Sequence, residues 1–221
     1  MKQFINIAID GPVASGKGTV AKGLSARLGI PTLDTGAMYR AVTVYLLDNK
    51  VDIRDEKKVL LALGRIDMRV FATEALTKVF LSGRDVSTRI RDNNISIATP
   101  VVAAYGAVRD FVNKKIAEIA TQGDFILEGR DIGTAVLPNA RYKFFLTASV
   151  EERAKRRMQE LKGKGENVSL VDMLIQVKER DEQDMNRKFA PLRQAADAIV
   201  IDGTSLTIEQ TIDTMAKYIK L

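Results

Sequence analysis

A glycine-rich segment near the amino terminus has the spacing of a phosphate-binding loop. Residues 11–17 read GPVASGK, which matches the pattern G-x-x-x-x-G-K. Glycines there allow backbone N–H groups to point into one concavity, and the lysine adds a mobile charge for the β- and γ-phosphates of a nucleotide. Gly18 stands where Ser or Thr is usual, so we expect Mg²⁺ to be held mainly by nucleotide phosphates and water, with no metal site made of side chains. The residues expected to bind the triphosphate of ATP are Gly11, Pro12, Val13, Ala14, Ser15, Gly16, Lys17, Gly18 and Thr19.

A second motif resembles the guanine-reading sequence of GTPases. Residues 49–52 read NKVD, which fits the pattern N-K-x-D. They follow Lys17 by only 32 residues, and no D-x-x-G switch lies between. We therefore interpret NKVD as a helix end and a turn.

Charged residues also stand where two predicted strands end. The segment 33–40 reads LDTGAMYR, in which Thr35 is expected to cap a helix and Arg40 to lie one turn into it. Taken alone, this could equally be a capped helix with a surface arginine. Arg130 and Asp131 follow a core strand directly. Charges at that place are poor structural elements and good ligand contacts, because ligands of α/β sheets bind at the carboxyl ends of the strands.

Two groups of arginines on predicted helices complete the set. Arg180, Asp184 and Arg187 have the spacing of one helix face, which is also typical of a solvated ion pair. Another face, on a helix that precedes a glycine- and lysine-rich tip, fits either a basic surface or a mobile flap over phosphates. Its residues are Arg153, Arg156 and Arg157.

Phosphoryl transfer accounts for these features together. The chain has no His and no Cys, which excludes Ser-His-Asp triads, cysteine nucleophiles, thiolate zinc sites and disulfides. Phosphoryl transfer needs neither residue, because its catalysis consists mainly of positioning and charge neutralisation. The net charge of +6 suits an anionic partner, although it also fits a solubilising surface.

The elements that must position these residues alternate along the chain. Hydrophobic periodicity predicts a parallel sheet covered by helices on both faces, with a small antiparallel hairpin (67–71 and 78–81, joined by 73–77) in an insertion over 51–93. Asp55 and Gly64 are expected to cap one helix, and Pro100 to interrupt another. The predicted strands are 4–10, 31–33, 125–127, 142–146 and 198–201, and the predicted helices are 19–28, 37–47, 56–63, 94–119, 150–161, 169–187 and 205–221.

Nothing in the sequence predicts a targeting or membrane segment. The apolar stretch near the amino terminus is too short for a signal peptide, and the longest uncharged stretch, 93–108, contains Asn, Ser, Thr and Pro. We expect a soluble, cytoplasmic monomer that acts on small nucleotides and binds neither nucleic acid nor membranes.

The motifs resemble those of bacterial cytidylate kinases, which are nucleoside monophosphate kinases, over essentially the whole chain. The resemblance implies an adenylate-kinase-like P-loop fold of one domain, 1–221, with a monophosphate-binding region at about 35–105 and a helical lid at about 153–169. It also implies transfer of the γ-phosphate of ATP to CMP or dCMP. The segments that carry it read IDGP (9–12), SGKGT (15–19), LDTGAMYR (33–40), GRDIGT (129–134), EERAKRR (151–157) and KERD (178–181).

The same resemblance assigns roles to individual residues. Two positions depart from the family pattern: Pro100 replaces a Ser that commonly contacts cytosine, with Thr99 beside it as the expected substitute, and Glu128 stands where many relatives have Asp. A carboxylate suits the amino group of cytosine and a guanidinium its ring acceptors, a pattern that uracil partly reverses. The implied roles are catalysis by Lys17, Arg40, Arg130 and Arg187; ATP binding by Arg157; acceptor-phosphate binding by Thr35, Arg40, Arg130 and Arg187; base binding by Arg109 and Asp131; and sugar binding by Arg180 and Asp184.

Three alternatives remain at this point. A related kinase of AMP or UMP would carry most of the same motifs. A basic RNA-binding module is disfavoured because aromatic residues make up only 6% of the chain and Trp is absent, which leaves few stacking platforms. A nucleotide-dependent switch lacks its signature sequences.

Overall fold

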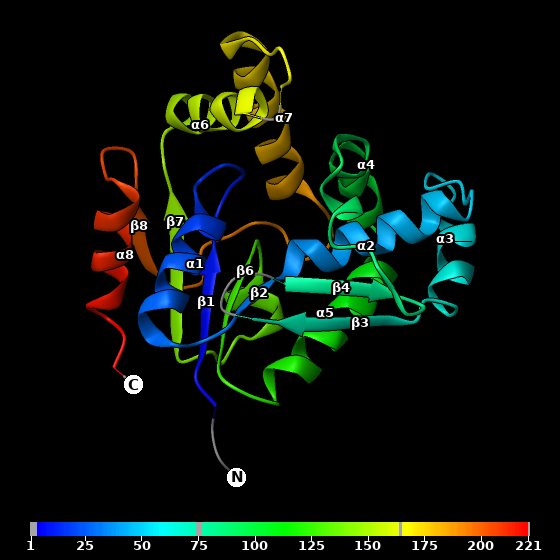
Figure 1. Ribbon diagram of the computed structural model, residues 1–221, viewed down its shortest axis with the longest axis horizontal. Coiled ribbons are helices and arrows are strands. Elements are labelled where there is room, and N and C mark those ends of the chain that lie inside the picture. The colour runs from blue at the N-terminus through cyan, green and yellow to red at the C-terminus, as the bar shows by residue number, and fades with distance from the viewer. Residues whose placement is uncertain (1–3, 74–76, 164, 221) are drawn as a thin grey trace.

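The centre of the computed structural model, which describes residues 4–73, 77–163 and 165–220, is a five-stranded sheet. Its order is β2-β6-β1-β7-β8, and all neighbouring strands run parallel (Figure 1). The predicted fold class is therefore confirmed. The strands are β1 (Asn6–Asp10), β2 (Thr32–Asp34), β6 (Phe125–Gly129), β7 (Tyr142–Thr147) and β8 (Ile199–Asp202).

Each face of the sheet has its own apolar core, as the alternation of side chains along β1 illustrates. Ile7 and Ile9 belong to the cluster that includes residues of α1 (Lys17–Leu28) and α8 (Ile208–Ala216). Ala8 belongs to the opposite cluster, which includes residues of α2 (Thr35–Asp48) and of further helices. Successive side chains of a strand point to opposite faces, so β1 is held on both sides.

The insertion after α2 folds as a small antiparallel sheet that covers the edge of the main one. Met68 pairs with Leu81, which confirms the predicted hairpin, while β5 was not predicted. The Thr32 N–H donates to the Thr73 carbonyl (3.1 Å), and the Asp34 N–H donates to Thr77 Oγ1 (2.9 Å). Part of the predicted joining segment, 74–76, lies outside the described residues. The elements here are α3 (Glu56–Leu63), β3 (Met68–Ala72), β4 (Thr77–Leu81), β5 (Arg84–Asp85) and η1 (Arg89–Arg91).

The helix caps confirm one prediction and correct another. Asp55 caps α3, which ends at Gly64 as expected. The prediction that Thr35 caps α2 is wrong, because the Asp34 carboxylate accepts the hydrogen bond from the Ala37 N–H (3.0 Å). Thr35 is the first helical residue, and its hydroxyl donates elsewhere, to the carbonyl of Glu128 (2.7 Å).

Pro100 does not interrupt its helix, contrary to the prediction. Helix α4 (Asn93–Ala103) runs through Pro100, and the chain turns by 104° only before α5 (Gly106–Ala120). Thr99 and Val102 are buried on either side of the proline, so tertiary packing compensates for the missing N–H. Among the described residues no single helix is long and apolar enough to span a bilayer. Only α4 and α5 taken together have the length and apolar composition of a span, and they are bent by 104°.

Two helices stand above the carboxyl ends of the strands (Figure 1). They are α6 (Val150–Gly163) and α7 (Leu170–Asn186), and they share a small apolar core of Ala154, Leu161, Met173 and Val177. One residue of the predicted tip, Lys164, lies outside the described residues.

Two further differences from the sequence predictions concern short elements. A short π-helix, η2 (Ile132–Val136), was not predicted. The last helix is shorter than expected because Thr207 and Gln210 form a reciprocal capping box that starts it at Ile208.

Candidate active site

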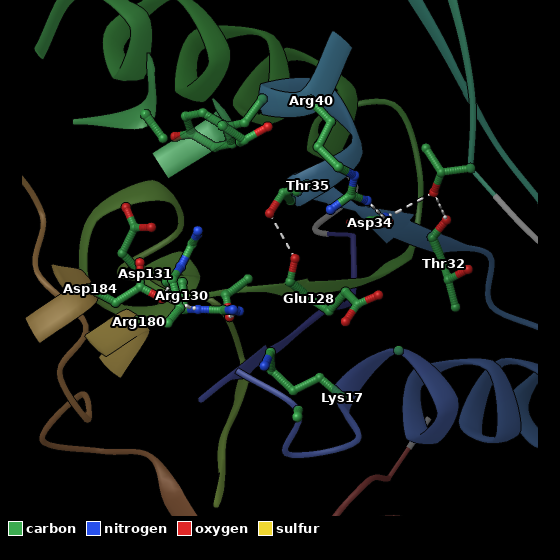
Figure 2. A pocket seen from close by; sticks show the side chains of 18 of the residues that line it. Lys17, Thr32, Asp34, Thr35, Arg40, Glu128, Arg130, Asp131, Arg180 and Asp184 are labelled. Atoms are coloured by element: carbon green, nitrogen blue, oxygen red, sulfur yellow. Dashed lines mark hydrogen bonds and ion pairs between the residues drawn. The ribbon is translucent and has the colours of Figure 1, made fainter. Parts of the chain in front are cut away.

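A cavity of about 490 Å³ opens at the carboxyl ends of β1, β2 and β6. The structure brings residues of the phosphate loop, the β2–α2 segment, the β6 end and α7 to its wall. Lys17, Arg40 and Arg130, which are far apart in the sequence, therefore face one common space (Figure 2). The predicted residues that line it are Ala14, Gly16, Lys17, Gly18, Thr19, Thr35, Arg40, Arg109, Arg130, Asp131, Arg180, Asp184 and Arg187.

Lys17 is a buried cation held against its own loop. Only 6% of the residue is exposed, and its Nζ donates to the Pro12 carbonyl (2.7 Å) and to Ser15 Oγ (3.3 Å). Burial, and then the positive charge of Arg130, lower the pKa of Lys17 to about 7. The ammonium is thus poorly compensated, and an anion in the cavity would stabilise it.

Four residues of the predicted phosphate loop do not line the cavity. Gly11 is required at its position because a Cβ there would lie 2.0 Å from the Leu146 carbonyl oxygen. The carbonyl of Val13 accepts a hydrogen bond from Arg153 (3.2 Å), and that of Ser15 accepts one from Arg156 (3.3 Å). These residues, together with Pro12, shape the loop from behind, where helix α6 supports it.

The three arginines of α6 consequently have different environments. Arg153 is 4% exposed and forms an ion pair with Asp181 of α7 (2.7 Å), so this part of α6 is not a basic surface. Arg157 pairs with Glu160 (2.7 Å) and lines a neighbouring cavity that Arg40 also lines. Its predicted contact with ATP stays a prediction.

Arginines and aspartates alternate in one network along the cavity wall that α5, the end of β6 and α7 form. Arg130 Nε donates to Asp184 Oδ2 (2.8 Å), which also accepts from Arg180 (3.3 Å). Arg187 lies between the two acids, 3.8 Å from Asp184 and 3.1 Å from Asp131. Arg109 donates to the other oxygen of Asp131 (2.5 Å). All six side chains are therefore fixed before any ligand binds.

The charges of this network keep Asp184 ionised. Burial alone would raise the pKa of Asp184, but Arg130, Arg180 and Arg187 lower it to about 2. Burial lowers the pKa of Arg180. The arginines have more hydrogen-bond donors than the two carboxylates occupy, so donors remain for phosphate oxygens.

Two acidic residues, Asp34 and Glu128, also line the cavity, and the sequence analysis assigned no role to either. Arg40 is held by Asp34 (2.6 Å), and the pKa of Asp34 is lowered because this arginine and the Ala37 N–H outweigh the effect of burial. Glu128 faces the phosphate loop: a Cβ at Gly18 would lie 2.9 Å from its Oε1 (Figure 2). Burial and the charge of Asp34 raise the pKa of Glu128 to about 7.

The sequence analysis did not identify the aromatic ring that packs against the Arg109 guanidinium. The Arg109 guanidinium lies 5.3 Å from the ring centroid of Tyr39, whose hydroxyl donates to Asn113 Oδ1 (2.9 Å). Tyr39 was within a recognised motif, but only the packing of α2 against α5 brings it to Arg109. Thr99 also lines the cavity, although its hydroxyl donates to the Ile95 carbonyl (2.6 Å).

Comparison with known proteins shows the family of this chain. The cytidylate kinase family model matches residues 7–221. A cytidylate kinase from Caldicellulosiruptor bescii is 49% identical over 208 residues, which cover 94% of this chain and 92% of that relative. A cytidylate kinase from Bacillus subtilis is 42% identical over 220 residues, covering 100% and 98% of the two chains.

Solved structures support the fold alone. An uncharacterized protein from Eubacterium ventriosum aligns with a TM-score of 0.50 at 18% identity and covers 97% of each chain. The family match and the relatives that align over nearly the full length lead to one statement: this chain belongs to the cytidylate kinase family.

Proposed function

We propose that the protein transfers the γ-phosphate of ATP to CMP or dCMP, giving ADP and CDP or dCDP. The observation that carries this proposal is that Lys17 of the phosphate loop and the Arg40 and Arg130 guanidiniums face one cavity. A donor phosphate on one side and an acceptor phosphate on the other can then meet without a protein nucleophile. Membership of the cytidylate kinase family favours cytidylate as the acceptor.

On the donor side, the loop from Gly11 to Thr19 surrounds the β- and γ-phosphates of ATP. Its backbone N–H groups and the start of α1 provide fixed positive ends of dipoles. Lys17 leaves its internal contacts with Pro12 and Ser15 and follows the transferred phosphoryl group. Arg157, on α6, reaches ATP from the lid side.

On the acceptor side, four residues bind the phosphate of the monophosphate: Thr35, Arg40, Arg130 and Arg187. Arg180 and Asp184 bind the sugar. Arg109 and Asp131 bind the base, where the carboxylate accepts from the amino group of cytosine. Each oxygen of Asp131 accepts one hydrogen bond from an arginine, and a carboxylate has about four acceptor sites, so capacity for the base remains.

Mg²⁺ accompanies ATP in this proposal, and one acidic side chain fits it. Gly18 offers no hydroxyl ligand, and the Glu128 carboxylate fills the space where a side chain at position 18 would lie. Carboxylate and phosphate oxygens suit a hard cation. Glu128 would therefore hold the ion's water, while phosphate oxygens provide the remaining ligands. The ion supplies charge neutralisation when it is bound.

The remaining proposals concern the division of the chain and its setting. We assign the acceptor-binding region to about 35–105 and the lid to about 153–169 within one domain, and we propose a cytoplasmic monomer that acts on free nucleotides. The α6–α7 pair supports the lid assignment because it has its own small core above the cavity.

One assay tests the substrate. ADP release is measured in parallel with CMP, dCMP, UMP and AMP at equal concentrations. We expect kcat/KM for CMP or dCMP to exceed the value for UMP and AMP by at least about tenfold, since one unpaired buried polar group costs roughly 1–3 kcal/mol. A preference for AMP or UMP would identify a related kinase instead.

A further inference from the structure

We propose that Asp10 is a positioning residue that ties the segment after β6 (130–133), here called the acceptor loop, to the start of the phosphate loop. This connection, here called the lock, would align the donor and acceptor phosphates for transfer. The inference rests on the proposed function, because it concerns the same two loops. Asp10 itself does not line the cavity, and no role follows for it from the phosphate-loop pattern, which begins at Gly11.

The Asp10 carboxylate makes one hydrogen bond with each of its oxygens. Oδ1 accepts from the Ile132 N–H (2.8 Å) and Oδ2 from the Gly133 N–H (2.7 Å). The residue is 4% exposed, so these bonds are shielded from water. Asp10 therefore joins two chain segments that are adjacent in space and distant in sequence.

These bonds hold the acceptor loop where the sheet no longer can. The ladder between β1 and β6 ends with the pair Asp10 and Gly129. Arg130 and Asp131 come next, where their side chains are held by ion pairs but their backbone has no further pairing with β1. The two bonds from Asp10 fix the residues that follow, so Arg130 and Asp131 are held on both sides.

The other end of the lock is equally fixed. Gly11, the next residue after Asp10, lies so close to β7 that a Cβ would be 2.0 Å from the Leu146 carbonyl oxygen. The start of the phosphate loop is thus packed directly against β7, the other neighbour of β1. Asp10 therefore positions both loops: it precedes the phosphate loop directly, and its carboxylate holds the acceptor loop.

The two hydrogen bonds require a carboxylate at position 10, although burial opposes its charge. Burial raises the pKa of Asp10 to about 6, against the lowering effect of its two backbone bonds, and the Asp131 charge adds to the rise. The ionised form is therefore a cost to the folded state, but only a side chain with two acceptor oxygens can satisfy both N–H donors. What the carboxylate offers is bidentate geometry.

The test distinguishes an effect on the alignment of the reacting phosphates from an effect on nucleotide binding. Asp10→Asn keeps the shape but turns an NH₂ group towards one of the two N–H donors. We expect kcat to fall about 10- to 100-fold, because small misplacements of reacting groups have effects of that size. Dissociation constants for CMP and for ATP, each measured alone by calorimetry, should change less than about threefold.

A second variant leaves the carboxylate in place. At Gly133, a Cβ would lie 3.2 Å from Lys143 Cδ and 3.4 Å from Asp10 Oδ2, so Gly133→Ala displaces mainly the Lys143 side chain and disturbs the bond to Asp10 only slightly. We expect the same division between kcat and binding, with a smaller effect. In the unsubstituted protein, amide exchange of Ile132 and Gly133 should be slow, and fast exchange would contradict the lock even if neither variant folds.

Asp124 provides the matched control. Its carboxylate accepts from the Ile5 N–H (2.6 Å) and so joins the same two neighbouring strands at their other end. Asp124→Asn should lower the melting temperature and leave kcat unchanged.

Lys17→Ala and Arg130→Ala, assayed alongside, distinguish the two levels of the argument. If they keep native turnover, the proposed site is wrong. If they lose turnover while Asp10→Asn keeps native kcat, or loses affinity in step with kcat, the lock is wrong.

Discussion

Lys17 carries a charge that the folded protein holds at a cost. Its pKa of about 7, lowered by burial and Arg130, lies below the usual value of 10.5. Between these two values the unfolded chain binds more protons, so the cost to folding is greatest below pH 7 and declines as pH rises towards 10.5. The enclosed ammonium is thus prepared for a polyphosphate.

The first prediction follows from the lowered pKa of Lys17. At pH 8 the free protein has mostly neutral Lys17, and bound phosphates should raise its pKa, so ATP binding takes up close to one proton. Calorimetry without Mg²⁺, in two buffers of different ionisation enthalpy, measures the uptake. Lys17→Ala should abolish most of it, and equal uptake by that variant would place the proton elsewhere.

The second prediction concerns the base. Asp131→Asn keeps the size of the side chain and replaces one acceptor oxygen by a donor, so we expect CMP to lose about 1–3 kcal/mol in kcat/KM while UMP loses less. Initial rates with both monophosphates give the comparison. Equal losses would remove Asp131 from base reading and leave it as the partner of Arg109 and Arg187.

At the residue scale, the sequence predicted the charged positions better than their partners. Lys17 could be found because it ends the phosphate-loop pattern, and Arg130 and Asp131 because they follow a core strand directly, where charge has no structural use. Asp34, which pairs with Arg40, and Tyr39, which lies under Arg109, could not be assigned. Their contacts depend on how α2 packs, and no local pattern reports that.

At the element scale, sharp turns decide where the loops stand. Gly11 and Gly29 both have positive φ, 153° and 67°, but their surroundings differ. A Cβ at Gly11 meets the backbone of β7, whereas a Cβ at Gly29 meets no described atom within 4 Å. Replacement by alanine therefore introduces backbone strain alone at Gly29, and backbone strain together with a steric collision at Gly11.

The third prediction uses that contrast. Gly29→Ala should lower the free energy of unfolding by about 1–2 kcal/mol, the cost of the left-handed conformation. Gly11→Ala adds a backbone collision, and we expect a loss above about 4 kcal/mol. Urea denaturation of both variants gives the difference, and similar losses would mean that β1 and β7 separate easily.

Elements were predicted well where one local signal acted alone. The capping of α3 by Asp55 and the β3–β4 hairpin needed no tertiary information. Pro100 was misjudged because buried neighbours keep α4 intact around it. The π-helix η2 was missed because the Asp131 carbonyl accepts from both Ala135 and Val136, a pattern with no signature in composition.

At the scale of the molecule, the sheet order places β1 beside β6, so the donor and acceptor loops leave adjacent strands. The α6–α7 pair stands above them and touches the acceptor region where Asn93 Nδ2 donates to Glu166 Oε2 (3.4 Å). Arg153 and Arg156 fix its base to the phosphate loop. Its outer end has fewer such anchors.

The fourth prediction is a gradient of hydrogen exchange. Amides near Glu166 and Ser169 should exchange faster than those of β1 and β6, because little apolar area holds the outer end of this pair. ATP and CMP together should slow them more than either alone. Mass spectrometry after deuterium labelling measures this, and exchange that ignores both nucleotides would contradict closure over the cavity.

The small sheet has a further consequence through its contacts with Thr32 and Asp34. Without it, β2 would be an outermost strand with unpaired peptide groups, a template for another chain. A shortened chain with a tight turn in place of 51–93 would therefore tend to form edge-to-edge oligomers. The insertion therefore occupies peptide groups of β2 that another chain could otherwise pair with.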